Sequence, residues 1–235
     1  MYTETLTLAN GVKIPQLGLG TWFIDDANAA EAVKAAAKLG YRHFDTAQAY
    51  GNERGVGEGV RSCGVAREEL FVVSKVAAEH KTYEAAKASI DATLQKMGLD
   101  YLDMMIIHSP QPWDKVNQCE DRYVEGNRAA WRALEEAYKE GKLRAIGVSN
   151  FQIGDLNSLL EGCTVKPMVN QILLHISNTP LELVEFCQNN GIAVGDTVTD
   201  TNGQTCEPRP HGDECRRGLC HQCRGHGEPQ ALQAH

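Results

Sequence analysis

The alternation of apolar segments with amphipathic helical segments constrains the fold of this chain more than any other feature of its sequence. Apolar runs at 70–75 ("LFVVSK") and 101–109 ("YLDMMIIHS") flank a clear helical pattern at 82–98. Repeated alternation of this kind predicts βα units and a parallel sheet, either a closed barrel or an open doubly wound sheet. About seven such units can be recognised before residue 194, whereas a closed barrel of this type has eight.

Turn and capping residues divide this pattern into elements. Asn10-Gly11, between two short alternating runs, predicts an N-terminal β-hairpin. Thr82 and Gly98 predict the two ends of the helix at 82–98. The segment 52–64 ("NERGVGEGVRSCG") is a weaker helix prediction, because glycine lowers helix propensity. Further helices are expected within 25–40, 120–142, 154–162 and 178–191.

Composition narrows the class of protein. Hydrophobic residues make up 42% of the chain and charged residues 23%, as in ordinary globular proteins. The net charge of −8 and the lack of a basic patch argue against nucleic acid as a partner. No apolar run approaches the roughly 20 residues that span a bilayer, and the first residues have no secretory pattern. We therefore expect a cytoplasmic protein with no membrane partner; the sequence leaves the oligomeric state open.

Ionisable side chains lie at three consecutive predicted strand ends, where parallel α/β proteins place their working residues. Asp45 and Tyr50 follow one strand, Lys75 ends the next, and His108 ends the third. Each residue alone has an ordinary structural explanation, such as a helix cap or a solvated strand end. The occurrence of all four at equivalent positions favours a catalytic site.

These four groups suit one kind of chemistry. A free tyrosine has a pKa of about 10 and donates its proton poorly, and a nearby lysine ammonium lowers that pKa. A buried Lys75 needs a carboxylate partner, which Asp45 can provide. His108 can then donate a hydrogen bond that orients a carbonyl oxygen. Such a site protonates a developing alkoxide, which predicts carbonyl reduction with hydride from a cofactor.

Two glycine-rich motifs do not predict a Rossmann domain. "GLGTW" at 18–22 lacks the third glycine of the dinucleotide fingerprint, and "GVGEGV" at 55–60 does not directly follow a strand.

Residues 1 to about 194 resemble the aldo-keto reductase family in six motifs: "GLGTW", "HFDTAQAYGNE", "VVSK", "IIHSP", "IGVSNF" and "NQILLH". The resemblance implies a TIM (β/α)8-type barrel with an N-terminal β-hairpin plug, here C-terminally truncated at about seven βα units. It also implies reduction of small aldehydes or ketones with NADPH.

The resemblance assigns a function to each matching position. Tyr50 is the general acid, Lys75 and Asp45 tune it, and His108 orients the substrate carbonyl. Ser149, Asn150 and Gln171 match the residues that hold the nicotinamide carboxamide. Thr21 and Trp22 match the loop beside cofactor and substrate, and Trp113 lines the substrate pocket. No metal ligand is assigned.

Residues 195–235 depart from the family and form a second, non-homologous region. They contain no Phe, Trp, Tyr, Ile, Met or Lys, so they have little to bury and are expected to be disordered. A zinc site is one explanation, because Cys220 and Cys223 form a C-x-x-C motif, but a second knuckle is missing. Its further candidate ligands are Cys206, Cys215, His221 and His226. A disulfide cluster is disfavoured in a cytoplasmic enzyme. We favour a reading-frame shift near Val194.

Three functional hypotheses follow from the sequence. The first is an NADPH-dependent carbonyl reductase whose catalytic residues all precede residue 194. The second is a non-catalytic, truncated barrel with impaired cofactor binding. The third is a metal-binding protein that uses the tail.

Overall fold

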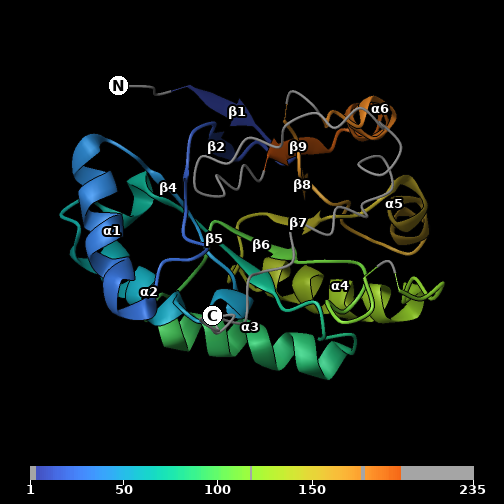
Figure 1. Ribbon diagram of the computed structural model, residues 1–235, viewed down its shortest axis with the longest axis horizontal. Helices are drawn as coiled ribbons and strands as arrows, with labels where there is room; N and C mark the ends of the chain where they lie inside the picture. Colours follow the sequence, from blue (N-terminus) through green and yellow to red (C-terminus); the bar gives the residue numbers. More distant parts are fainter. Residues whose placement is uncertain (1–3, 117, 176–177, 197–235) are drawn as a thin grey trace, which may run out of the picture.

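A parallel sheet of seven strands organises the computed structural model, which describes residues 4–116, 118–175 and 178–196. The strands lie side by side in chain order, from β3 to β9, and every pair is parallel (Figure 1). Their bounds are β3 Leu19–Gly20, β4 His43–Asp45, β5 Phe71–Val76, β6 Met104–Ile107, β7 Ile146–Ser149, β8 Val169–Ile172 and β9 Ala193–Asp196. The predicted parallel βα architecture is therefore confirmed.

In the described part of the chain, six α-helices follow the strands and form an arc on the outside of the sheet, from α1 through α3 and α4 to α5 and α6 (Figure 1). They are α1 Asp26–Leu39, α2 Glu53–Ser62, α3 Tyr83–Met97, α4 Val124–Lys139, α5 Ile153–Leu160 and α6 Leu181–Asn189, with short 3₁₀ turns η1 Gln48–Tyr50 and η2 Arg67–Glu69. Within the described residues no ladder joins β3 to β9. The molecule is thus a partial (β/α)8 barrel.

The N-terminal hairpin lies at the amino ends of the strands. β1 Thr5–Thr7 pairs antiparallel with β2 Lys13–Pro15, as the Asn10-Gly11 motif predicts. Gly11 has a φ of 85°, a conformation that favours glycine. Asn10 Nδ2 donates to the carbonyl oxygen of Arg144 at 2.9 Å, just before β7 begins. Pairing and placement both agree with a plug at the base of the barrel.

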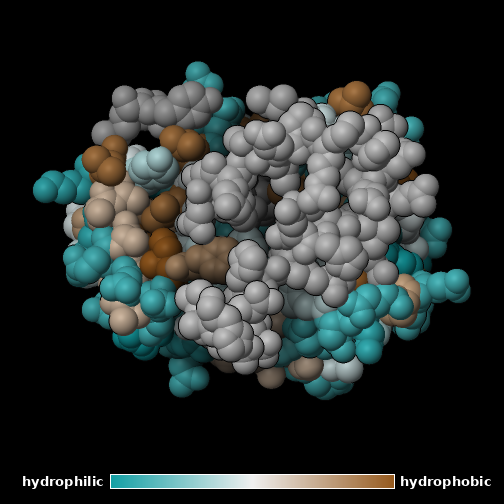
Figure 2. Space-filling model, viewed as in Figure 1, coloured by the Kyte–Doolittle hydropathy of each residue, from teal (hydrophilic) through white to brown (hydrophobic). Residues whose placement is uncertain are grey.

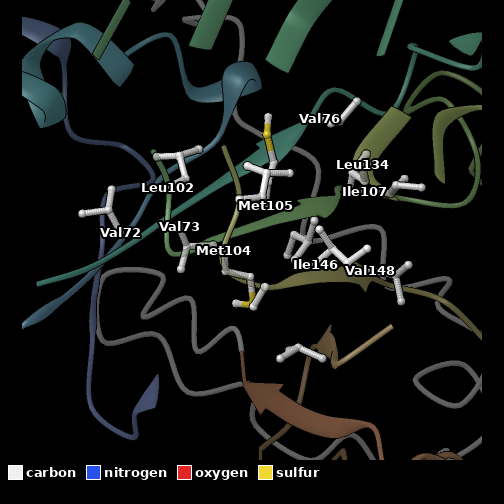
Figure 3. Packing of buried hydrophobic residues seen from close by; sticks show 14 of the residues in the cluster. Val72, Val73, Val76, Leu102, Met104, Met105, Ile107, Leu134, Ile146 and Val148 are labelled. Atoms are coloured by element: carbon white, nitrogen blue, oxygen red, sulfur yellow. The ribbon is translucent and has the colours of Figure 1, made fainter. Parts of the chain in front are cut away.

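The core lies on both faces of β5, β6 and β7. Every residue of these three strands is buried. Figure 3 shows Met105 and Met104 pointing to opposite sides of β6, with Val73 of β5 beside Met104. On the face seen in Figure 2, the described rim is largely hydrophilic, and hydrophobic side chains gather beside α1, over the region of β4. Burial on both faces fixes these strands rigidly, so their ends are a stable platform for a site.

Helix α2 forms although it contains three glycines, because those glycines permit close packing. A Cβ at Gly55 would lie 2.2 Å from the carbonyl oxygen of Asp26, at the start of α1. A Cβ at Gly57 would lie 2.2 Å from the carbonyl oxygen of Met97, at the end of α3. The weak local helix propensity is therefore offset by packing that no other residue allows.

The described chain ends with β9, which pairs with β8 over its four residues from Ala193 to Asp196. Residues 197–235 lie outside the described residues, and with them the candidate zinc ligands Cys206, Cys215, Cys220, Cys223, His221 and His226. The expected disorder of that tail likewise concerns residues that the structure does not describe. Among the helices of the described part, none is long and apolar enough to cross a membrane.

Replacing Gly57 by alanine should destabilise the protein. The added methyl group would overlap the backbone at Met97, and overpacking of this kind costs about 1–3 kcal/mol. The free energy of unfolding, measured by urea denaturation, should fall by that amount. Gly154→Ala in α5 is the matched control, since its Cβ would meet nothing within 4 Å and should slightly stabilise the helix. Equal effects at the two positions would contradict the packing argument.

Candidate active site

The four ionisable residues singled out in the sequence converge at the carboxyl edge of the sheet. Asp45 is the last residue of β4, Lys75 lies one residue before the end of β5, and His108 directly follows β6. Pairing of Lys75 with Ile106 aligns the ends of β5 and β6. Tyr50 is carried to the same edge by the 3₁₀ turn η1.

Lys75 is the centre of this cluster. Its side chain is only 1% exposed, and its ammonium forms a salt bridge with Asp45 Oδ1. The same Nζ donates to the carbonyl oxygen of Thr46 at 2.9 Å and to the hydroxyl of Tyr50 at 3.4 Å. All three acceptors come from the strand β4 and the turn after it, so the buried charge is compensated by one neighbouring segment.

The pKa of Tyr50 is shifted in the opposite direction from the one that the sequence predicted. Burial of the phenol is the largest influence and raises the pKa above its ordinary value of 10.0. The Lys75 ammonium opposes this rise, whereas the Asp45 carboxylate adds to it. The net direction is upward, so at neutral pH Tyr50 carries its proton. Lys75 instead offsets part of the burial effect.

His108 is neutral under ordinary conditions. Burial and the nearby Lys75 ammonium lower its pKa from 6.5 to about 3. Its ring lies edge-on to Tyr50, with centroids 5.5 Å apart, and to Trp113, with centroids 4.9 Å apart. The buried Nδ1 atom has no hydrogen-bond partner among the described residues. A neutral imidazole in this place can donate one hydrogen bond without adding charge.

The three residues expected to hold a carboxamide lie at the ends of β7 and β8. Ser149 Oγ and the backbone N–H of Asn150 both donate to the carbonyl oxygen of Gln171, at 2.8 and 2.9 Å. Asn150 adopts a left-handed φ of 62°, and its Nδ2 donates to the carbonyl oxygen of His108 at 3.0 Å. Gln171 Nε2 donates to Asp45 Oδ2 at 3.0 Å, while its buried Oε1 has no partner among the described residues.

The loop after β3 forms one side of the site. Thr21 is fully buried, and its hydroxyl donates to the carbonyl oxygen of Asp45 at 3.0 Å. Trp22 is 47% exposed and lies parallel to Tyr50, with ring centroids 6.3 Å apart. Trp113, 42% exposed, lies edge-on against His108. The structure thus brings together every site residue that the sequence predicted.

Sequence reasoning missed two amides that hold the turn around Tyr50. Asn52 is fully buried, accepts from Thr46 Oγ1 at 2.6 Å, and donates to the carbonyl oxygens of Thr21 and Ile24. Gln48 bonds to Ala77, directly after β5, and to Ser89 and Thr93 on α3. The only available signal was the presence of polar residues on either side of Tyr50, which is equally typical of a solvated turn.

Comparison with known proteins identifies the family. The family model for the aldo/keto reductase family matches residues 16–197. The chain belongs to the aldo-keto reductase family. A glyoxal reductase of Bacillus subtilis is 47% identical over 190 residues, which cover 80% of this chain and 64% of that protein. An NADPH-dependent aldose reductase of Saccharomyces cerevisiae is 41% identical over 215 residues, covering 82% and 65%. The chain thus spans less than two thirds of the length of these relatives.

Solved structures show the same relationship. An aldo/keto reductase from Brucella melitensis matches with a TM-score of 0.77 and 38% identity, covering 83% of this chain and 72% of that one. An aldo-keto reductase of Bombyx mori, solved in complex with NADP, matches with a TM-score of 0.76 and 31% identity, covering 91% and 73%. The partial barrel therefore has the fold of the aldo-keto reductases.

The residues at the ends of β7 and β8 offer an acceptor that fits the carboxamide of a nicotinamide. The unpartnered oxygen Gln171 Oε1 is a buried acceptor, and a carboxamide NH₂ is a matching donor. Within the described residues no group of three or more His, Cys, Asp or Glu side chains is arranged to hold a metal.

The depressed pKa of His108 predicts a specific loss of stability in acid. Its folded pKa of about 3 lies below the ordinary 6.5, so on acidification the unfolded chain binds this proton first. The stabilisation is complete above pH 6.5 and is lost as the pH falls toward 3, by up to about 1.4 kcal/mol per pH unit. Urea denaturation should show that His108→Gln loses less stability than the unmodified protein between pH 6.5 and about 5. Parallel pH dependences would contradict the assignment.

Proposed function

We propose that this chain reduces aldehydes or ketones to alcohols with hydride from NADPH, and that Tyr50 is the general acid. The observation that carries the proposal is the position of the buried Lys75 ammonium, which contacts the Asp45 carboxylate, the Thr46 carbonyl oxygen and the Tyr50 hydroxyl at once. This arrangement gives a tyrosine at the carboxyl edge of the sheet a cationic neighbour, which an ordinary structural tyrosine does not need.

This geometry suggests the route by which the proton reaches the substrate. A neutral His108 donates a hydrogen bond to the substrate carbonyl oxygen and polarises it. Tyr50 then gives its hydroxyl proton to the oxygen as the carbonyl carbon accepts hydride. The resulting phenolate lies next to the Lys75 ammonium, whose charge stabilises it. Asp45 keeps Lys75 charged while it is buried.

NADPH supplies the hydride when it is bound. Ser149, Asn150 and Gln171 are proposed to hold its carboxamide, and Thr21 and Trp22 to flank it. The free acceptor on Gln171 supports this placement. The Nε2 of the same side chain contacts Asp45 Oδ2, so the proposed cofactor site and the proton donor share one carboxylate.

The proposed substrate is a small carbonyl compound bound between Trp22 and Trp113. Both indoles are partly exposed, and Trp22 lies against Tyr50 whereas Trp113 lies against His108. Small sugar-derived and α-dicarbonyl compounds fit this proposal, and relatives are named for reduction of glyoxal and of aldose.

A non-catalytic partial barrel is the second candidate. It is favoured by one observation: β3 and β9 are not joined by a ladder within the described residues. Both candidates predict the same side chains at the sheet edge, so only turnover separates them.

Replacing Tyr50 by phenylalanine tests the proposal directly. NADPH consumption by the purified chain with a reactive aromatic aldehyde should fall by about 10²–10⁴-fold, because general acid catalysis contributes that much. Tyr101→Phe is the matched control. Tyr101 lies before β6, stacked with Arg67 at 4.1 Å, and its substitution should leave turnover unchanged. No turnover by the unmodified, folded chain would favour the non-catalytic candidate, and undiminished turnover by Tyr50→Phe would remove Tyr50 as the acid.

Gln171 should recognise the NH₂ group of the nicotinamide carboxamide. Affinity for NADPH and for its acetylpyridine analogue, in which a methyl group replaces that NH₂, can be measured by fluorescence titration. The unmodified protein should prefer NADPH by about tenfold, the equivalent of one buried hydrogen bond of roughly 1–2 kcal/mol. In Gln171→Met this preference should disappear. A preference that survives the substitution would show that Gln171 does not contact the carboxamide.

A further inference from the structure

The turn that carries Tyr50 has little backbone support of its own. It is a 3₁₀ turn of three residues, held by the bonds from Tyr50 N to the Ala47 carbonyl oxygen at 3.0 Å and from Gly51 N to the Gln48 carbonyl oxygen at 3.3 Å. Side chains must therefore fix where Tyr50 lies relative to β5.

Gln48 uses every part of its amide for this purpose. Its Oε1 accepts from the backbone N–H of Ala77 at 2.8 Å. Its Nε2 donates to the carbonyl oxygen of Ser89 and to Thr93 Oγ1, both at 3.0 Å. Ser89 and Thr93 belong to the buried face of α3. One side chain thus ties the Tyr50 turn to both a strand end and a helix.

The hydrogen bond between Gln48 and Ala77 connects the turn that carries Tyr50 to the strand that carries Lys75. Ala77 follows Lys75 by two residues, directly after the end of β5, whereas Gln48 precedes Tyr50 by two residues. Any shift of the turn away from β5 must break this bond or lengthen the 3.4 Å contact between Tyr50 Oη and Lys75 Nζ. At that length the contact already lies beyond the usual range of a hydrogen bond, so a small displacement would abolish it.

We propose that Gln48 is a positioning residue that holds the Tyr50 hydroxyl within reach of Lys75, and that it thereby governs the pH at which the proton donor ionises. Among the residues that the structure describes, the charged groups that act on Tyr50 are Lys75 from β5 and Asp45 from β4, and His108, after β6, is neutral. Lys75 alone among these favours the phenolate. A longer distance between Tyr50 and Lys75 removes their hydrogen bond and weakens the attraction of the Lys75 charge, so burial and Asp45 raise the pKa of Tyr50 further. The catalytic consequence rests on the proposed function, but the ionisation does not.

Gln48→Met tests the inference, because methionine keeps the length of the side chain and removes its three hydrogen bonds. The ionisation of Tyr50 can be followed in the cofactor-free protein as the ultraviolet tyrosinate signal that disappears in Tyr50→Phe. This transition should move to higher pH in Gln48→Met. In turnover, kcat should fall by about tenfold, part of the contribution of a general acid, while KM for NADPH changes little. The pH above which reduction declines should rise.

Gln95→Met is the matched control, since Gln95 lies on the exposed side of α3 and should leave both readouts unchanged. Gln48→Asn, whose amide is one methylene short of its partners, should shift them in the same direction as Gln48→Met and serves if the methionine variant does not fold. An unchanged tyrosinate transition in folded Gln48 variants would overturn the inference, whether or not the chain turns over. Absence of turnover in the unmodified chain, with a shifted tyrosinate transition, would instead overturn the proposed function alone.

Discussion

The buried ammonium of Lys75 is the interaction on which the rest of the site depends. A lysine that is 1% exposed keeps its charge only if its surroundings replace water, and here a carboxylate, a backbone carbonyl oxygen and a phenol do so. These partners come from Asp45, Thr46 and Tyr50, which lie within six residues of chain that begin at the last residue of β4. The parallel pairing of β4 with β5 is therefore a chemical requirement as well as a structural one.

The fold could be predicted from the sequence wherever local propensity and tertiary packing favour the same structure. Strand–helix alternation, the Asn10-Gly11 hairpin and the capped helix at Tyr83–Met97 all follow from residues close together in the chain. Helix α2 shows the limit of this reasoning. Gly55 and Gly57 weaken the helix locally, yet they let α2 approach the backbones of α1 and α3. That gain depends on helices distant in the sequence, so propensity alone underrates the segment.

The candidate site could also be predicted in part from the sequence. Position at a strand end pointed to Asp45, Lys75 and His108, because parallel strands align their carboxyl ends. The pKa direction of Tyr50 was not readable, since burial outweighs the lysine and burial is a tertiary property. The Thr46 carbonyl is equally invisible, because every residue has one. The anchoring amide of Gln48 could not be told from a solvated polar turn residue until Ala77 and α3 were placed beside it.

Asp45 divides its two oxygens between Lys75 and Gln171, and this division explains how a partial barrel can still assemble the cluster. Gln171 lies on β8 and Asp45 on β4, so the contact crosses the barrel interior between residues 126 positions apart. It connects the proposed nicotinamide site to the proton donor by one carboxylate without using β9. All the residues of the cluster are carried by β3 to β8 and the loops that follow them, a continuous run of paired strands. The side-chain contacts of Lys75, Tyr50 and Asp45 that the structure shows are therefore all made within that run of strands and loops.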